Sequence, residues 1–297
     1  MTATRRGTLY GAGAYLLWGL FPLYWPLLAP SAPLEVLAHR ILWSLVVVVV
    51  LLAVTRRVEQ VRAAVRDRRR IAQIALAAVV VAINWGTYIY GVTNDRVVET
   101  SLGYFVNPIV TVLLGVVVLG ERLRPAQWTA LGAAFVAVVV LTVENGSPPW
   151  IALVLAFSFG TYGLLKKTAG VGAVEGLAIE TGVLLPVAAV YVVVIGGGTF
   201  ATEGVGHAAL LALSGVVTAI PLLLFGAAAS RIPLSTLGVL QYLAPTMQFV
   251  LGITLFDEPL PAVKLLGFSL VWCAVALFTI DLLRHGRQLR LQVTAPA

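Results

Sequence analysis

Residues 107–121 read NPIVTVLLGVVVLGE, and 137 positions later residues 244–258 read APTMQFVLGITLFDE. Each run is apolar and carries a proline at its second position, a glycine at its ninth and a glutamate at its last. A second match, 140 positions apart, pairs EVLAHR at 35–40 with EGLAIE at 175–180. These spaced matches predict that the chain contains two copies of one structural unit. They divide it into three segments: residues 1–145, residues 146–285 and a tail at residues 286–297.

The composition predicts that both copies lie in a membrane. Hydrophobic residues make up 60% of the chain and charged residues 11%, against about 45–50% and about 25% in soluble domains. Apolar runs of about 20 residues, enough helix to cross roughly 30 Å of hydrocarbon, recur throughout the chain. They do not alternate in polarity as barrel strands would. We predict an all-α integral membrane protein with ten spans: 7–28, 35–54, 71–92, 99–119, 126–143, 149–165, 174–195, 207–229, 234–256 and 263–283. With five spans in each copy, the second copy enters the bilayer from the opposite side, so the ten transmembrane helices form two inverted five-helix repeats.

The net charge is +7, and the basic residues lie mainly on one side of the predicted membrane spans. This distribution argues against a nucleic-acid partner. Of the 20 lysines and arginines, Arg40 falls inside a span, Arg96 and Lys264 fall in a loop or at a span end on one side, and the others fall on the opposite side. Basic loops mark the cytoplasmic side of a membrane protein. We therefore expect both termini to be cytoplasmic. The basic loop at 55–70 joins them there and meets anionic membrane lipids.

Several motifs carry a resemblance to a known family. They are ETSLGYFVNP at 99–108, LGER at 119–122, AHRILWS at 38–44, LLPVAA at 184–189, STLG at 235–238 and QY at 241–242. With these motifs the chain resembles the RarD-like branch of the EamA transporters, in the drug/metabolite transporter superfamily. The resemblance implies ten helices in two inverted five-helix repeats, a location in the bacterial cytoplasmic membrane and the movement of small solutes. Members of this branch are often labelled chloramphenicol-resistance permeases, which is a label for the branch and not a substrate assignment.

Two ionisable residues fall inside predicted spans, at equivalent positions of the two copies. Arg40 lies five residues after Glu35, and Glu180 lies five residues after Glu175. Inverted copies place Arg40 near the outer mouth and Glu180 near the inner one, roughly 15 Å apart in depth, so we predict separate gating or coupling roles. Burial favours the protonated form of a carboxyl, which makes Glu180 the candidate for coupling to protons. The alternatives are that Arg40 snorkels to the interface and that a neighbouring helix satisfies Glu180; the adjacent His39 fits packing.

Polar, aromatic and proline residues gather at mid-span positions. A mid-helix proline frees backbone carbonyls near the bilayer centre, which is tolerated where they face protein or a wet cavity. We therefore predict a solute cavity at the midplane between the copies. Its predicted lining residues are Trp18, Asn84, Trp85, Tyr88, Tyr104, Asn107, Tyr162, Gln241 and Tyr242, with helix kinks at Pro108, Pro221 and Pro245. Rings and amides without a dense set of charges suit an amphipathic or zwitterionic organic solute. Core packing and fixed structural kinks are the alternatives. Trp25, Trp43 and Trp150 lie towards span ends and fit interface anchors.

The sequence predicts a secondary transporter working by alternating access, with no enzymatic activity, metal or cofactor. Cys273 is the only cysteine, and His39, His207 and His285 have no metal-ligand spacing. No phosphate-binding Gly-rich loop ends in Gly-Lys-Ser/Thr, which argues against ATP drive within the chain. One alternative is a membrane sensor or scaffold that moves nothing. Another is an intramembrane enzyme, which would need paired acids or metal ligands at one depth.

Overall fold

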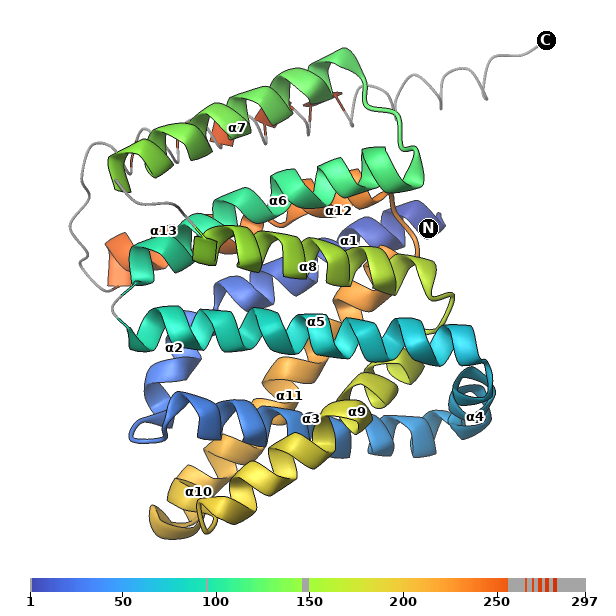
Figure 1. The fold of residues 1–297 in the computed structure, drawn as a ribbon, viewed down its shortest axis with the longest axis vertical. Helices are drawn as coiled ribbons and strands as arrows, with labels where there is room; N and C mark the ends of the chain where they lie inside the picture. The colour runs from blue at the N-terminus through green and yellow to red at the C-terminus, as the bar shows by residue number, and fades with distance from the viewer. Residues whose placement is uncertain are drawn as a thin grey trace.

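The computed structural model describes residues 2–94, 96–145 and 150–255, with scattered positions between Leu265 and Asp281. Regular structure in these residues is helical throughout (Figure 1). The elements are α1 (Ala3–Gly19), α2 (Phe21–Tyr24), η1 (Trp25–Leu28), α3 (Pro33–Thr55), α4 (Val58–Arg66), α5 (Arg68–Thr93), α6 (Val97–Leu119), α7 (Pro125–Asn145), α8 (Trp150–Thr168), α9 (Ala173–Val194), α10 (Gly198–Thr202), α11 (Gly204–Ala229), α12 (Leu234–Leu240) and α13 (Leu243–Leu255). The tenth predicted span, 263–283, and the predicted tail at 286–297 lie largely or wholly outside the described residues.

The long helices coincide with the predicted spans to within a few residues, but two spans are interrupted. The span expected at 7–28 ends as α1 at Gly19 and continues as the short α2 and η1. Pro22 and Pro26 lie in these short helices, where a missing backbone N–H and the fixed proline ring oppose one continuous helix. The span expected at 234–256 is divided into α12 and α13 by a turn at Gln241 and Tyr242.

Several helices are long and apolar enough to cross a membrane. Within the described ranges they are Pro33–Thr55, Arg68–Gly91, Ala173–Val194, Gly204–Ala229 and Leu234–Leu255, and Gly103–Leu119 is a shorter apolar helix. Large apolar side chains such as Val49, Val117 and Val193 are exposed on the outside of these helices, which is the arrangement expected where lipid replaces water. The chain is therefore a multi-pass helical membrane protein.

Glu35 and Glu175, which are equivalent in the two predicted copies, join α3 and α9 at opposite ends. Glu35 at the start of α3 accepts hydrogen bonds from the backbone N–H of Thr199, at 2.6 Å, and from its hydroxyl, at 2.8 Å. Thr199 follows the end of α9. Glu175 at the start of α9 accepts a hydrogen bond from Arg57, just beyond the end of α3, at 3.3 Å. The two helices are therefore antiparallel, and each glutamate reaches the residues that follow the other helix.

Three further helix pairs between the copies are antiparallel as well, whereas α6 and α8 run parallel, because a Cβ at Gly103 would meet Leu155 and one at Gly160 would meet Leu114. The start of α1 meets the end of α11, where a Cβ at Gly7 would lie 2.7 Å from Ile232. The end of α5 meets the start of α8, because Asn84 donates to the carbonyl of Leu155 at 2.9 Å. The end of α6 meets the start of α12 through Glu121, described below. In the predicted repeat, α1 is equivalent to α8 and α5 to α11, so the α1–α11 pair is equivalent to the α5–α8 pair. The α3–α9 and α6–α12 pairs each join two equivalent helices.

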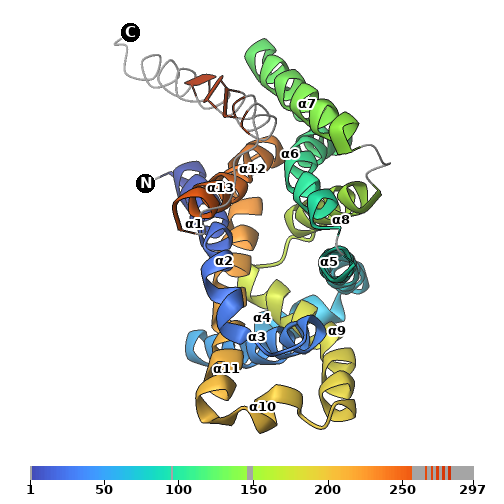
Figure 2. The same cartoon turned by 90° about the vertical axis from the view of Figure 1, so that its left-hand side faces the viewer.

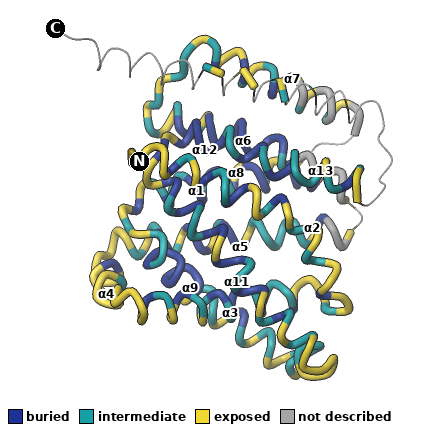
Figure 3. The backbone as a smooth tube through the Cα atoms, turned by 180° about the vertical axis from the view of Figure 1, so that it is seen from behind, coloured by how far each residue is buried: buried dark blue, intermediate teal, exposed yellow. Residues whose placement is uncertain are grey.

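The buried core lies where these pairs meet. The largest cluster contains Tyr15, Tyr162, Phe225 and Leu237 from α1, α8, α11 and α12. Viewed along many of the helices, α1, α2 and α11 lie on one side and α5, α8 and α9 on the other (Figure 2). The buried residues form a band through the middle of the molecule, while α4 and much of α7 are exposed (Figure 3).

Two helices lie outside the predicted spans, the short α10 and the longer α4. The basic loop at 55–70 contains α4, which packs Val61 and Ala64 against Ile179 of α9 and exposes Arg62 and Arg66. The N-terminus and α4 lie at the same end of the helices, on the right in Figure 1. Most of the basic residues in the described part of the chain therefore gather at one face of the molecule.

Candidate functional site

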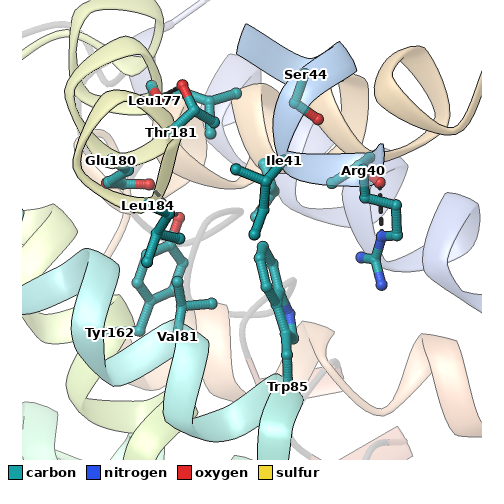
Figure 4. Close-up of a pocket in the computed structure, with 12 residues that line it drawn as sticks. Arg40, Ile41, Ser44, Val81, Trp85, Tyr162, Leu177, Glu180, Thr181 and Leu184 are labelled. Atoms are coloured by element: carbon teal, nitrogen blue, oxygen red, sulfur yellow. Dashed lines mark hydrogen bonds between the residues drawn. The ribbon is translucent and has the colours of Figure 1, made fainter. Parts of the chain in front are cut away.

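A narrow cavity lies between the two copies, at the centre of the helix assembly (Figure 4). Residues of α3 and α5 wall it from the first copy, and residues of α8, α9 and α11 wall it from the second. Its polar lining residues are Arg40, Ser44, Trp85, Tyr162, Glu180, Thr181 and Thr218. The free space is about 10 Å³, close to the room that one water molecule needs. The lining side chains therefore leave little free space in the cavity.

Glu180 forms a buried ion pair with Lys166 on this wall. Lys166 Nζ lies 2.7 Å from Glu180 Oε1, and the Tyr162 hydroxyl donates to Glu180 Oε2 at 3.0 Å. The side chains of Lys166 and Glu180 are only 7% and 3% exposed. Two glycines make room for the lysine: a Cβ at Gly176 would lie 2.8 Å from Nζ, and one at Gly226 would lie 3.2 Å from Cε. The acid in the membrane interior is thus neutralised and hydrogen-bonded by the neighbouring helix α8.

Arg40 lies elsewhere on the wall and has a different environment. Its Nε donates to the Thr218 hydroxyl at 2.9 Å. Its guanidinium carbon lies 4.8 Å from the ring centroid of Trp25 and 5.0 Å from that of Trp85. In Figure 4 the guanidinium points away from Glu180, with Trp85 between them. Arg40 and Glu180 line one cavity without pairing, and the idea that they act as gate or coupling residues stays a prediction.

Of the predicted cavity residues, Trp85 and Tyr162 line the cavity together with Arg40 and Glu180. Trp18 packs in the core, with its ring centroid 5.4 Å from that of Tyr15. Asn84 joins α5 to α8 by donating to Leu155 and to the Ser158 hydroxyl. These two residues hold the helices beside the cavity, outside the lining that the structure shows.

The other predicted residues lie near α6. Tyr88 and Tyr104 are in ring contact, with centroids 6.1 Å apart. The Tyr242 hydroxyl donates to the carbonyl of Phe105 at 3.2 Å. The side-chain oxygens of Asn107 and Gln241 are buried without hydrogen-bond partners in the described part of the chain. Unpaired buried oxygens are costly, so these two amides are polar groups that the packing of the described residues does not satisfy.

The prolines lie within helices but interrupt them unequally. Pro108 lies inside the continuous helix α6, and Pro221 lies inside α11. Pro245 lies near the start of α13, just after the turn that separates it from α12. A Cβ at Gly238 would lie 3.0 Å from the carbonyl oxygen of Pro108. The carbonyl of the proline itself in one copy is thus approached by a glycine of the other.

His39 agrees with the packing alternative. Its ring is stacked on Phe200 with centroids 4.9 Å apart, and neither ring nitrogen has a hydrogen-bond partner among the described residues. The same residues contain no group of three or more His, Cys, Asp or Glu side chains able to hold a metal ion.

Sequence reasoning missed Lys166, Thr218 and Trp25 as parts of the site. Lys166 follows the span predicted at 149–165 and so belongs to the basic residues expected in loops, whereas it lies in the last turn of α8. The useful signal was Glu180 itself, because an acid inside a membrane requires a partner. Trp25 fits an interface anchor by its place near a span end, but the turn at Leu20 brings its ring over Arg40.

Comparisons with known proteins agree with this architecture. Residues 5–143, within the first predicted copy, match the model of the EamA-like transporter family. The protein named RarD of Streptomyces exfoliatus is 55% identical over 99% of this chain and 94% of its own length. The uncharacterized transporter YojE of Bacillus subtilis is 40% identical over 96% of this chain and 97% of its own. The architecture and these relatives define a membrane transporter.

The chain belongs to the EamA family, as a RarD-like permease. A solved crystal structure with only 20% sequence identity shares the fold, with a TM-score of 0.70 over 92% of this chain and 97% of that one.

Proposed function

We propose that the protein is a secondary transporter that moves a small organic solute across the bacterial cytoplasmic membrane by alternating access. Ten helices form two inverted repeats, residues 1–145 and 146–285, and both termini are cytoplasmic. The observation that carries the proposal is the central cavity, because both copies wall it and each contributes one ionisable side chain, Arg40 and Glu180. A site at the interface of inverted repeats is the arrangement on which such transporters rely.

The antiparallel helix pairs support the inverted repeat. Glu35 and Glu175 hold α3 and α9 together at opposite ends through equivalent contacts. Rocking of one copy against the other would loosen one of these contacts and keep the other, which opens the cavity to one side at a time. The narrow cavity of about 10 Å³ fits a form between the two open ones, in which no solute is bound.

Thiol labelling tests alternating access without knowledge of the solute. Cys273 is the only cysteine, so Cys273→Ser provides a background for single cysteines. In it, Thr181→Cys in the cavity should react with a membrane-impermeant thiol reagent added to intact cells and also to inverted vesicles. The controls are two exposed positions at opposite ends of the helices. Glu203→Cys should react from outside only, and Arg66→Cys should react from inside only. Reaction of the cavity cysteine from one side alone, or from neither, contradicts alternating access.

Coupling to protons is assigned to Glu180, the acid in the cavity wall. A screen of metabolites and drugs in cells with and without the protein identifies a solute for proteoliposome assays. We expect Glu180→Gln to lose uptake driven by a pH gradient and to retain exchange of solute at equal pH, because the amide cannot carry a proton across. Undiminished uptake driven by the gradient removes the coupling role.

A further inference from the structure

Arg40 presents unused hydrogen-bond donors beside the cavity. Its Nε is occupied by Thr218, and the N–H groups on its two terminal nitrogens remain. Within residues 2–94, 96–145 and 150–255, no carboxylate pairs with Arg40 and no second acceptor takes a hydrogen bond from it. Its terminal nitrogens are also not among the enclosed polar atoms of this part of the chain that lack partners. They therefore border space that water can reach.

The acids near Arg40 are already engaged by other groups. Glu180, on the same cavity, is paired with Lys166 and accepts from Tyr162. Glu35, which precedes Arg40 on α3, accepts from the backbone N–H groups of Thr199 and Phe200. The wall of the cavity therefore carries one positive charge without a counter-ion among the described residues. A charge in the membrane interior is costly, and such residues mark substrate paths.

The rings around Arg40 orient it without neutralising it. Trp25 and Trp85 lie about 5 Å from its guanidinium carbon, and Phe21 lies 6.0 Å away. The faces of such rings attract a cation but carry no net charge. The rings accept none of the conventional hydrogen bonds that the guanidinium can donate, so its terminal nitrogens keep a fork that fits the two oxygens of a carboxylate.

Given the transport function proposed above, we propose that Arg40 binds the carboxylate of the solute and that the solute is an organic monoanion. One negative charge balances the one unpaired cation of the cavity wall. A dianionic phosphate would leave an excess negative charge, and a neutral solute would leave Arg40 without a counter-ion. Trp25, Trp85 and Phe21 supply apolar surface for the body of the solute beside its carboxylate.

Acid and amide pairs of equal shape test this class of solute. The panel is phenylacetate with phenylacetamide, indole-3-acetate with indole-3-acetamide, and hexanoate with hexanamide, titrated calorimetrically into the purified full-length protein. For at least one pair we expect the acid to bind about tenfold more tightly than the amide, because a charge-assisted, two-pronged hydrogen bond is lost with the amide. If no acid in the panel binds more tightly than its amide, the proposal is overturned.

Variants assign the preference to Arg40. Arg40→Gln should abolish it, and Arg40→Lys should retain part of it, since the charge remains and the fork is lost. Arg231→Gln is the matched control: Arg231 also lies over a ring, 5.7 Å from that of Tyr10, but it is exposed at a helix end. It should keep the full preference. A preference that survives in Arg40→Gln refutes the assignment, and the comparison of acid with amide in the wild-type protein decides the case if that variant does not fold.

These measurements separate the binding class from the transport mechanism. The titrations use protein in detergent and require no transport. If the wild-type protein shows no preference for the acids while Thr181→Cys is labelled from both sides, only the carboxylate site is overturned. If the wild-type protein prefers the acids while Thr181→Cys is labelled from one side only, the carboxylate site is supported and alternating access is overturned.

Discussion

Removing Lys166 should leave Glu180 as a buried acid without its counter-ion. The two charged atoms lie 2.7 Å apart with side chains 7% and 3% exposed. At an effective dielectric constant of about 20 this distance corresponds to an attraction of about 6 kcal/mol. Removing one partner of a buried pair costs about 3–5 kcal/mol after relaxation. For a chain of this size about 2 °C is lost per kcal/mol. We therefore expect Lys166→Met to lower the apparent melting temperature in detergent by about 6–10 °C.

The double variant Lys166→Met with Glu180→Gln separates loss of the pair from loss of one partner. Its amide can still accept the hydrogen bond from Tyr162, and no unpaired charge remains, so most of the loss should be recovered. The control is Arg66→Met, which breaks an exposed contact with Glu59 at 4.0 Å and should change the melting temperature little. If Lys166→Met melts like the wild-type protein, or if the double variant is no better than the single one, the two charges do not stabilise each other.

Three further predictions concern packing, a helix start and the site. Gly215→Leu should prevent stable insertion, because a Cβ there meets the backbone of α3, whereas Gly182→Leu, with nothing within 4 Å, should be tolerated in yield and gel filtration. Glu121→Ala should cost about 1–2 kcal/mol, measured as thermal stability, because its carboxylate accepts the first backbone N–H groups of α12 at 2.6 and 2.8 Å; an unchanged melting temperature would argue against this cap. Asn107→Ala and Trp85→Ala should abolish solute transport while inserting normally, and wild-type rates in both would discard the predicted cavity set.

The long helices could be predicted because an apolar run of membrane length admits few other structures. The exceptions have local causes that the composition of a run does not express. Pro22 and Pro26 interrupt the first span. The charge of the basic loop at 55–70 predicts its side of the membrane, whereas helix α4 depends on the three-residue spacing of Val61 and Ala64, which pack against α9.

The site was predicted in part because its ionisable residues stand out in an apolar sequence. Arg40, Trp85, Tyr162 and Glu180 were singled out and line one cavity. Their partners depend on how helices pack across the two copies, and a single sequence does not specify those contacts. Lys166 illustrates this, since its position next to a loop concealed a side chain that turns inward along two glycines.

The equivalent contacts of Glu35 and Glu175 offer a way to trap the protein in defined conformations. Each joins the start of one helix to the residues beyond the end of its counterpart, at opposite faces. In a background of Cys273→Ser, a covalent staple between positions 35 and 199 would fasten one mouth, and a staple between 57 and 175 would fasten the other. Two variants of the protein, each locked in a different conformation, could then be prepared, and each would allow a different stage of the transport cycle to be imaged.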